Sequence, residues 1–315
     1  MYLPKSITVC DVGLRDGLQI EKHILTVEEK LALVHALEDA GVKVIEVGSF
    51  MRPKNVPQMA NTDEVFQRLL PKSGVEYRAL VGNLKGVERA IACGCRKVKL
   101  NVSASKGHNL ANLNALPLDT MRGFAAQAEL ARAAGLAVSG SIACPFGSPW
   151  DKVISLSEIK EIITAYVQVG VTEISISDAS GMAMPKQVFE LMTQLQHSYP
   201  NCKFILHFHN TRGMGIANVM AGMEAGITWF DGSFAGTGGC PFVPGAAGNV
   251  STEDIVHMCA EQGIVTGINL SKIIALGHHV EKLIGHVGGS FVLKAGTNED
   301  LHLAMPCGQI ERQEK

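Results

Sequence analysis

The chain has 315 residues, of which 46% are hydrophobic and 18% charged, and its formal net charge is −2 at pH 7. These apolar residues suffice for a large buried core. The balanced charge and the aromatic content of 5% argue against a nucleic-acid-binding surface, which needs basic runs and stacking rings. No uncharged apolar stretch of about 18 residues is present, so no membrane-spanning helix is expected.

The start of the chain and its cysteines bear on the compartment. Residues 1–6 lead directly into an apolar run and lack the features of a signal or transit peptide. The eight cysteines are scattered, and Cys93 and Cys95 are too close together for a zinc-finger pair. We therefore expect reduced thiols and a cytoplasmic protein.

Eight β-rich runs are expected to form strands, in chain order 7–12, 42–47, 77–81, 97–100, 136–138, 173–176, 204–207 and 227–230. Helical patterns alternate with them near 27–40, 60–70, 84–93, 119–134, 155–169, 185–198, 214–225 and 252–262. At five of the helix-to-strand junctions a glycine stands where the helical pattern stops, as expected for a left-handed helix end. These junctions contain Gly41, Gly94, Gly135, Gly170 and Gly226.

This alternation predicts a parallel sheet, and eight units over about 260 residues match an α/β protein of the (β/α)8 TIM-barrel type. An open doubly wound sheet is the alternative. It would need a glycine-rich phosphate loop after the first strand, where residues 11–17 carry charged groups instead. We expect an additional C-terminal helix over 271–285 and poor anchoring of the last 15 or so residues. The expected organisation is one catalytic domain, 1–290, containing a glycine-rich loop at 236–249, and a tail, 291–315.

The active site of such a barrel lies at the carboxyl ends of its strands. The sequence places polar, ionisable and thiol side chains there, namely Arg15, Asp16, Glu46, Cys144, Asp178, His207, His209, Cys240 and Asn249. His207 and His209 are two apart on a strand, so their rings point the same way, and Asp16 follows a strand nearby. Two imidazoles, a carboxylate and an amide oxygen suit Mg²⁺ or Mn²⁺, with Zn²⁺, Co²⁺ or Fe²⁺ also compatible.

Each of these residues also has a structural interpretation. The two histidines can be neutral, hydrogen-bonded residues inside the barrel, and Asn249 can be a turn residue before a helix. Arg15 can form an ion pair with Glu46 or Asp178, and both acids can pair with Arg15 or Lys99. Cys240 can be an incidental thiol, although flanking glycines favour an exposed and reactive loop.

Two runs carry a resemblance to a known family. Residues 12–22 (VGLRDGLQIEK) resemble the opening signature of 3-hydroxy-3-methylglutaryl-CoA (HMG-CoA) lyases, within the metal-dependent lyase and synthase superfamily named for its Asp-Arg-Glu motif. Residues 235–242 (AGTGGCPF), continuing through Asn249, resemble that family's cysteine loop. Residues 53–59 and 83–86 fit as well, and the similarity runs from about residue 7 to 290.

The resemblance implies metal ligands at Asp16, His207, His209 and Asn249. It also implies an essential arginine at Arg15 and a catalytic thiol at Cys240, and Glu46 and Asp178 match acidic residues of the family site. The implied reaction is retro-Claisen cleavage of a 3-hydroxy-3-methyl acyl-CoA, with HMG-CoA the leading substrate. In that reaction Asp16 or His207 takes the hydroxyl proton, Arg15 stabilises the enolate, and Cys240 protonates it. The resemblance also suggests a homodimer.

The chain departs from the family pattern at five positions, several of them near the expected substrate, which are Val47, Gly48, Ala179, Asn210 and Arg212. Arg212 can engage a differently placed carboxylate, as in citramalyl-CoA, or form a salt bridge on the rim. The sequence does not decide which groups hold the CoA nucleotide. Lys22, Arg52 and Lys54 are the candidates for binding its phosphates. A condensing enzyme or aldolase of the same superfamily and a non-catalytic metal- or CoA-binding barrel are the competing functions.

Overall fold

The computed structural model describes residues 3–239 and 247–300. Eight parallel strands form a closed barrel in the order β1 to β8, and the pairing of β1 with β8 closes it. The strands are β1 Thr8–Asp11, β2 Val44–Ser49, β3 Glu76–Val81, β4 Lys97–Ser103, β5 Ala137–Ala143, β6 Glu173–Asp178, β7 Lys203–Phe208 and β8 Trp229–Gly232. The predicted TIM barrel is thus confirmed, and β4 and β5 extend well beyond the expected runs.

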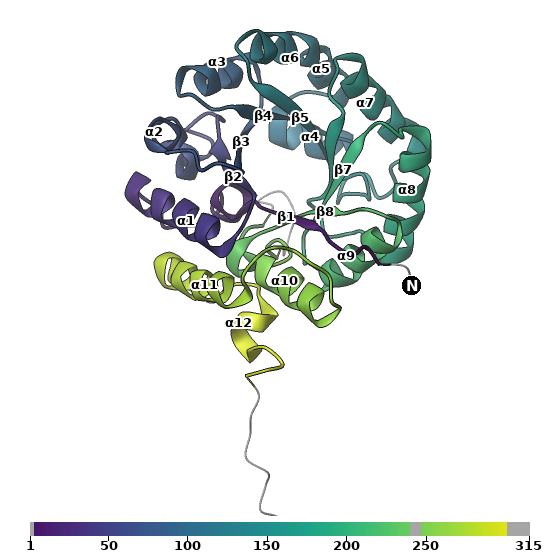
Figure 1. Cartoon of the computed structure of the whole chain (residues 1–315). Helices are drawn as coiled ribbons and strands as arrows, with labels where there is room; N and C mark the ends of the chain where they lie inside the picture. The colour runs from purple at the N-terminus through teal and green to yellow at the C-terminus, as the bar shows by residue number, and fades with distance from the viewer. Residues whose placement is uncertain (1–2, 240–246, 301–315) are drawn as a thin grey trace, which may run out of the picture.

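Helices surround the barrel, and α11 lies between α10 and α1 in the outer ring (Figure 1). They are α1 Val27–Ala40, α2 Thr62–Arg68, α3 Leu84–Ala92, α4 Lys106–Leu113, α5 Pro117–Arg122, α6 Phe124–Ala133, α7 Leu156–Gln168, α8 Pro185–Ser198, α9 Gly215–Glu224, α10 Thr252–Glu261, α11 Leu270–Ile284 and α12 Phe291–Ala295. The helix α11 is the expected additional C-terminal helix.

Three helical features differ from the sequence expectation. The single helix predicted near 119–134 is wrong, because Pro117 starts α5 and Gly123 separates α5 from α6. The sequence analysis missed α4, which Ser105 caps by accepting a hydrogen bond from the amide of His108. It also missed α12, whose first amides donate to the carboxylate of Asp254 on α10.

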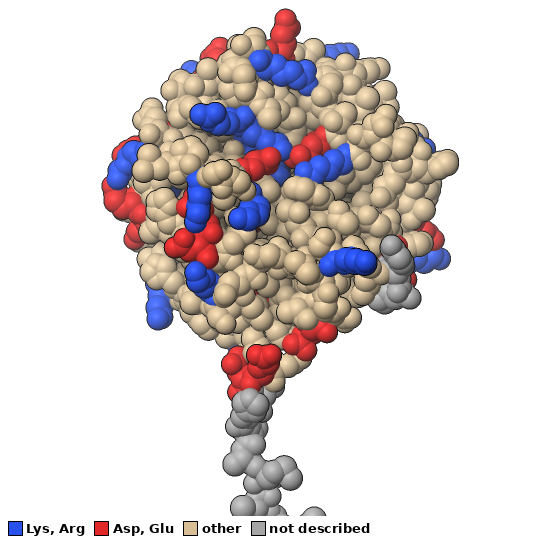
Figure 2. Space-filling view, in the orientation of Figure 1, with Lys and Arg blue, Asp and Glu red and all other residues tan. Residues whose placement is uncertain are grey.

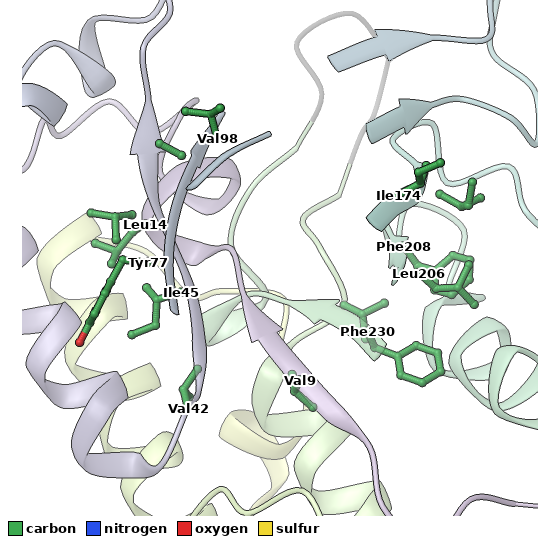
Figure 3. Close-up of a cluster of buried hydrophobic side chains, with 14 of the residues drawn as sticks. Val9, Leu14, Val42, Ile45, Tyr77, Val98, Ile174, Leu206, Phe208 and Phe230 are labelled. Atoms are coloured by element: carbon green, nitrogen blue, oxygen red, sulfur yellow. The ribbon is translucent and has the colours of Figure 1, made fainter. Parts of the chain in front are cut away.

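The core has two layers with different chemistry. Between the strands and the helices lies a large apolar layer, part of which Figure 3 shows with Ile45, Leu206 and Phe230 on their strands. Inside the barrel the apolar cluster is small, comprising Cys10, Val44 and Ile205. The remaining interior holds an ionic layer of buried, paired charged side chains, which are Glu46, Arg78, Lys99 and Asp231.

The visible surface carries mixed charges. Figure 2 shows lysine and arginine interspersed with aspartate and glutamate, with no broad area of one sign on the face in view. Among the helices of the described residues, none has the length and apolar character needed to cross a bilayer.

Candidate active site

The turn after β1 carries Arg15 and Asp16. It is a short π-helical segment, Gly13–Gly17, anchored where Asp11 Oδ1 accepts a hydrogen bond of 2.8 Å from the amide of Gly13. A Cβ on Gly13 would lie 2.6 Å from the ring of Phe234, so only glycine allows this approach. The close packing fixes the turn against the segment after β8 and holds Asp16 at the mouth of the barrel.

Asp16, His207 and His209 meet at one point. Their ligand atoms all lie within 4.8 Å of one another, and all three side chains are buried. Asp16 Oδ2 is 3.3 Å from His209 Nε2 and 3.8 Å from His207 Nε2. Within residues 3–239 and 247–300, this is the one group of three or more acidic, histidine or cysteine side chains with this geometry.

The other ring nitrogens of the two histidines indicate how the imidazoles are oriented. His207 Nδ1 lies 3.2 Å from Asp231 Oδ2, and His209 Nδ1 lies 3.4 Å from the carbonyl of Ala247. When Nδ1–H donates to these oxygens, both Nε2 atoms present lone pairs toward Asp16. Two lone pairs and a carboxylate that share one point form a ligand set for a cation.

Asn249 completes this set from the segment after β8. Its Nδ2 donates to Asp16 Oδ2 at 2.9 Å and to the carbonyl of Thr237 at 3.0 Å. Its Oδ1 is buried and has no hydrogen-bond partner. A buried amide oxygen without a donor is costly, and a divalent cation would satisfy it. The residues present therefore fit a divalent metal held by Asp16, His207, His209 and Asn249.

Electrostatics keep the carboxylate of Asp16 ionised. Burial alone would raise its pKa, but the Arg15 guanidinium beside it holds that pKa well below its usual range. Arg15 forms an ion pair with Asp16 and donates from Nε to Glu46 Oε1 at 2.5 Å. Arg15 remains charged, because these two carboxylates outweigh its burial and raise the guanidinium pKa. It lies between the ligand set and the ionic layer.

Glu46 belongs to the ionic layer. It lies within β2 rather than at its end, is fully buried, and pairs with Arg15, Arg78 at 3.2 Å and Lys99. Burial raises its pKa, but these three cations outweigh burial and lower the pKa to about 2. The structural interpretation of Glu46 as an ion-pair partner of Arg15 and Lys99 is thus correct, and Glu46 orients Arg15.

Asp231 is a residue that the sequence analysis missed. It stands opposite His207 in the β7–β8 register, pairs with Arg78 at 2.8 Å, and contacts His207 Nδ1. Despite its burial, Lys99 and Arg78 lower the pKa of Asp231 far below its usual range. The expected eighth strand ended at residue 230. A strand two residues longer would have placed Asp231 inside the barrel, beside His207.

Asp178, at the end of β6, is the hydrogen-bond acceptor of the turn that follows that strand. Its carboxylate accepts hydrogen bonds from the amides of Met182 and Ala183, both at 3.0 Å, and from the hydroxyl of Ser180 at 3.1 Å. Neither Arg15 nor Lys99 is among its described ion-pair partners, so the expected pairing with them is wrong. Burial raises its pKa. Asp178 therefore shapes the turn that follows β6 and carries Ala179.

A cavity of about 600 Å³ opens beside the ligand set. Its wall includes Arg15, Asp16, His207, His209, Ala179 and Gly239. The helix α4 forms another part of the wall through His108 and residues 111–113. Cys240, the expected catalytic thiol, lies outside the described residues, but the residue before it in the chain lines this cavity.

The three expected CoA-phosphate partners, Lys22, Arg52 and Lys54, are exposed and do not line the cavity. Met51 and Asn55, which are close to Arg52 and Lys54 in the chain, do line it. The basic side chains therefore belong to a segment that borders the cavity.

The five departures from the family pattern differ in their position relative to the cavity. Ala179 lines the cavity, whereas Val47 packs in the apolar layer and Gly48 lies against Thr62. Asn210 Oδ1 accepts a hydrogen bond of 3.0 Å from the amide of Gly215. Arg212 is exposed and donates to the carbonyls of Ser180 and Gly181, both at 3.1 Å, rather than to a carboxylate among the described residues. Of the five, Ala179 is the one in the described cavity wall.

The chain is similar to known proteins over most of its length. Residues 6–280 match the family model described as HMGL-like. The chain is 37% identical to a 3-hydroxy-3-isohexenylglutaryl-CoA/hydroxymethylglutaryl-CoA lyase of Pseudomonas aeruginosa, over 94% of this chain and 98% of the relative. It is also 37% identical to an (R)-citramalyl-CoA lyase of Chloroflexus aurantiacus, over 93% of this chain and 95% of the relative.

A solved structure shares the fold throughout. It is that of an HMG-CoA lyase from Acinetobacter baumannii in complex with coenzyme A and 3-methylmalate, with a TM-score of 0.92 and 38% identity. The match covers 96% of this chain and 98% of the other. The closed barrel, the ligand set and the relatives together define a carbon–carbon lyase of the TIM-barrel class that acts on an acyl-CoA. Within that class, the chain belongs to the HMGL-like family of HMG-CoA lyases and their relatives.

Proposed function

We propose that this chain cleaves HMG-CoA to acetoacetate and acetyl-CoA, with a divalent metal bound by Asp16, His207, His209 and Asn249. The observations that carry the proposal are the three ligand atoms within 4.8 Å of one another and Asn249, which contacts Asp16 through Nδ2 and keeps a buried Oδ1 without a donor. Asp16, His207 and His209 share with Arg15 a cavity that is large enough for an acyl group.

The metal would supply Lewis acidity, lowering the pKa of the substrate's 3-hydroxyl and fixing its orientation. Oxygen- and nitrogen-donor ligands favour Mg²⁺ or Mn²⁺, and the two histidines keep Zn²⁺, Co²⁺ and Fe²⁺ compatible.

The chain's own residues would move the protons and stabilise the charge. Asp16 or His207 accepts the proton of the 3-hydroxyl, the C2–C3 bond breaks, and its electron pair forms the enolate of acetyl-CoA. Arg15, held in place by Glu46 and Asp16, would stabilise the enolate oxygen. Cys240 would then deliver a proton to the enolate carbon, and Asp178 would act by shaping the turn beside the cavity.

The acyl group is the less constrained part of the proposal. The relatives named above act on HMG-CoA, on a larger isohexenylglutaryl-CoA and on citramalyl-CoA. Ala179, a small residue in the cavity wall, leaves room next to the substrate. Citramalyl-CoA or another branched 3-hydroxyacyl-CoA is therefore the second candidate substrate. A condensing or aldol reaction of the same superfamily is a weaker alternative to cleavage.

The proposal also covers CoA binding, the metabolic role, the oligomeric state and the location of the protein. Lys22, Arg52 and Lys54 would bind the phosphates of CoA from the exposed segments bordering the cavity. HMG-CoA cleavage would give the protein a place in leucine catabolism. A homodimer and a cytoplasmic location complete the proposal.

The test is cleavage of a panel of 3-hydroxyacyl-CoA esters by the purified protein with Mg²⁺ or Mn²⁺, measured as release of acetyl-CoA. Cleavage of HMG-CoA is expected, and no cleavage of any ester would refute the lyase function. Cleavage of citramalyl-CoA but not of HMG-CoA would make citramalyl-CoA the proposed substrate. The variant Cys240→Ala should lose most of its turnover at unchanged metal content, whereas loss of metal would identify the thiol as a ligand.

A further inference from the structure

His108 is a histidine in the cavity wall to which the reaction so far assigns no role. It lies on α4, the helix inserted between β4 and α5, and its side chain is 3% exposed. It lines the same cavity as Arg15, His207 and His209, yet it is outside the metal-ligand group. A buried polar ring in the wall of an active-site cavity is a candidate for direct contact with the substrate.

The structure around His108 anchors its backbone and packs its ring. Ser105 Oγ accepts the hydrogen bond from the amide of His108 at 3.1 Å and lies 2.6 Å from Asp151 Oδ2. Asp151 also accepts from the amide of Gly107, at 3.1 Å. The ring of His108 packs against Trp150, with the ring centroids 6.3 Å apart. Two segments, α4 and the loop after β5, are thereby tied together at this residue.

A second anchor fixes the same helix from its other side. Asn109 accepts a hydrogen bond from the amide of Ser103 at 2.8 Å and donates to the carbonyl of Ala115 at 2.8 Å. Gly107 leaves no room for a side chain, since a Cβ would lie 2.4 Å from Trp150. Groups held this firmly, on both sides, are the kind that stabilise charge as it develops in a reaction.

His108 presents a neutral imidazole to the cavity. Burial lowers its pKa to about 4. Above about pH 5 one ring nitrogen therefore carries a proton and can donate it in a hydrogen bond without adding charge to the site.

We propose that His108 is a further catalytic residue, a neutral hydrogen-bond donor to the thioester oxygen of the substrate, sharing with Arg15 the stabilisation of the enolate. The inference rests on the proposed lyase function. In that reaction the metal would act on the 3-hydroxyl, so the charge that develops on the thioester oxygen would be left to donors of the protein. That oxygen gains negative charge when the C2–C3 bond breaks, and donors placed around it act mainly on the transition state.

The first test compares His108→Ala and His108→Gln with the wild type in cleavage of HMG-CoA. Removing a donor to a developing oxyanion lowers kcat by about 100-fold, and KM should change by less than about threefold because the ground state is little affected. His108→Gln keeps an N–H donor and should recover part of the lost kcat. His278→Ala, at an exposed histidine of α11, is the matched control and should behave as the wild type.

A second measurement separates this contact from a structural or metal-binding role. The protein with bound Mn²⁺ should catalyse exchange of the methyl protons of acetyl-CoA with D₂O, which reports enolate formation without cleavage. His108→Ala should lower that exchange rate by the same factor as kcat, while its Mn²⁺ affinity and melting temperature stay close to wild type. A kcat within twofold of wild type, or a loss of Mn²⁺ affinity that accounts for the loss of kcat, would overturn the assignment.

The same exchange assay keeps the two proposals apart. If the wild type cleaves no acyl-CoA ester but exchanges the acetyl-CoA protons, the substrate assignment fails while His108 remains testable by exchange. If the wild type cleaves HMG-CoA and His108→Ala cleaves it equally well, the lyase function holds and the role of His108 is refuted.

Discussion

The two ends of the barrel both hold an acid among several polar groups, yet they are built differently. At the amino end, Glu173 is surrounded by cations of the chain, with Lys97 at 2.7 Å, Lys203 at 3.1 Å and Arg78 at 3.9 Å. At the carboxyl end, Asp16 lies close to two imidazole nitrogens and accepts a hydrogen bond from Asn249, whose own amide oxygen has no donor.

The difference shows what distinguishes a ligand set from an ion-pair cluster. The cations around Glu173 compensate its charge within the chain, which gives a structural network. Around Asp16, Arg15 is the one described cation of the chain in contact, and the other groups are further potential ligands. Two imidazole nitrogens beside a carboxylate, together with an amide oxygen that lacks a donor, form a set that a cation from outside the protein would complete.

The sharpest test of this contrast is to neutralise each acid in turn. Asp16→Asn should abolish Mn²⁺ binding and lower kcat by about 1,000-fold or more, since several kcal/mol of transition-state stabilisation depend on the bound cation. Glu173→Gln should leave Mn²⁺ affinity unchanged. Calorimetric titration with Mn²⁺ and steady-state cleavage measure both, and tight metal binding by Asp16→Asn would break the comparison.

Asp231 links the two ends, because it contacts His207 above and Arg78 below. Asp231→Asn should weaken metal affinity by about 10- to 100-fold, since it removes the acceptor that orients a ligand histidine. It should also destabilise the fold by about 3 kcal/mol, because Arg78 keeps its charge in a buried site. Urea unfolding and metal titration separate the two effects. An unchanged metal affinity would show that His207 is oriented without Asp231.

Glu253 gives a pH-dependent contrast with the acids of the ionic layer. Burial raises its pKa to about 8 from an ordinary value of 4.5, although its hydrogen bonds with Ala235 and Ser251 oppose this. A carboxyl with a raised pKa binds its proton more tightly in the folded state, so its contribution to stability is greatest below pH 4.5 and declines as pH rises toward 8.

Glu253→Gln should therefore flatten the fall in unfolding free energy between pH 4.5 and 8, measured by urea unfolding across that range. Glu224→Gln, at an exposed position of α9, is the control and should keep the wild-type slope. Glu46 should behave in the opposite sense, because its pKa is lowered to about 2 and its stabilisation is lost as pH falls from 4.5 toward that value. An unchanged slope in Glu253→Gln would contradict the raised pKa.

The smallest effect is expected at Arg212, on the rim of the carboxyl end. Its described hydrogen bonds go to two main-chain carbonyls, and its side chain is exposed. Arg212→Ala should change kcat/KM for HMG-CoA and for citramalyl-CoA by less than about twofold, as most exposed substitutions do. A selective loss of citramalyl-CoA cleavage would instead restore the hypothesis that Arg212 binds the substrate's carboxylate.

The barrel could be predicted because its signals are local. Glycines such as Gly41 end helices, and the β-rich runs that follow them alternate with helical patterns along the whole chain. The prediction that His207 and His209 point the same way also rests on a local signal, since side chains two apart on a strand share a face. The helices α4 and α12 were missed because they are short, and the anchoring of α12 depends on Asp254 in a distant helix.

The sequence by itself therefore determined the barrel, the family and the list of candidate ligands. Only the tertiary structure decided that Asp16 and Asn249, 233 residues apart, share a hydrogen bond and leave one oxygen unpaired. It also decided that Asp231 supports His207, that Glu46 orients Arg15, and that His108 enters the cavity wall. These relationships arise when the barrel closes and brings distant strand ends together, and no period or spacing along the chain encodes them.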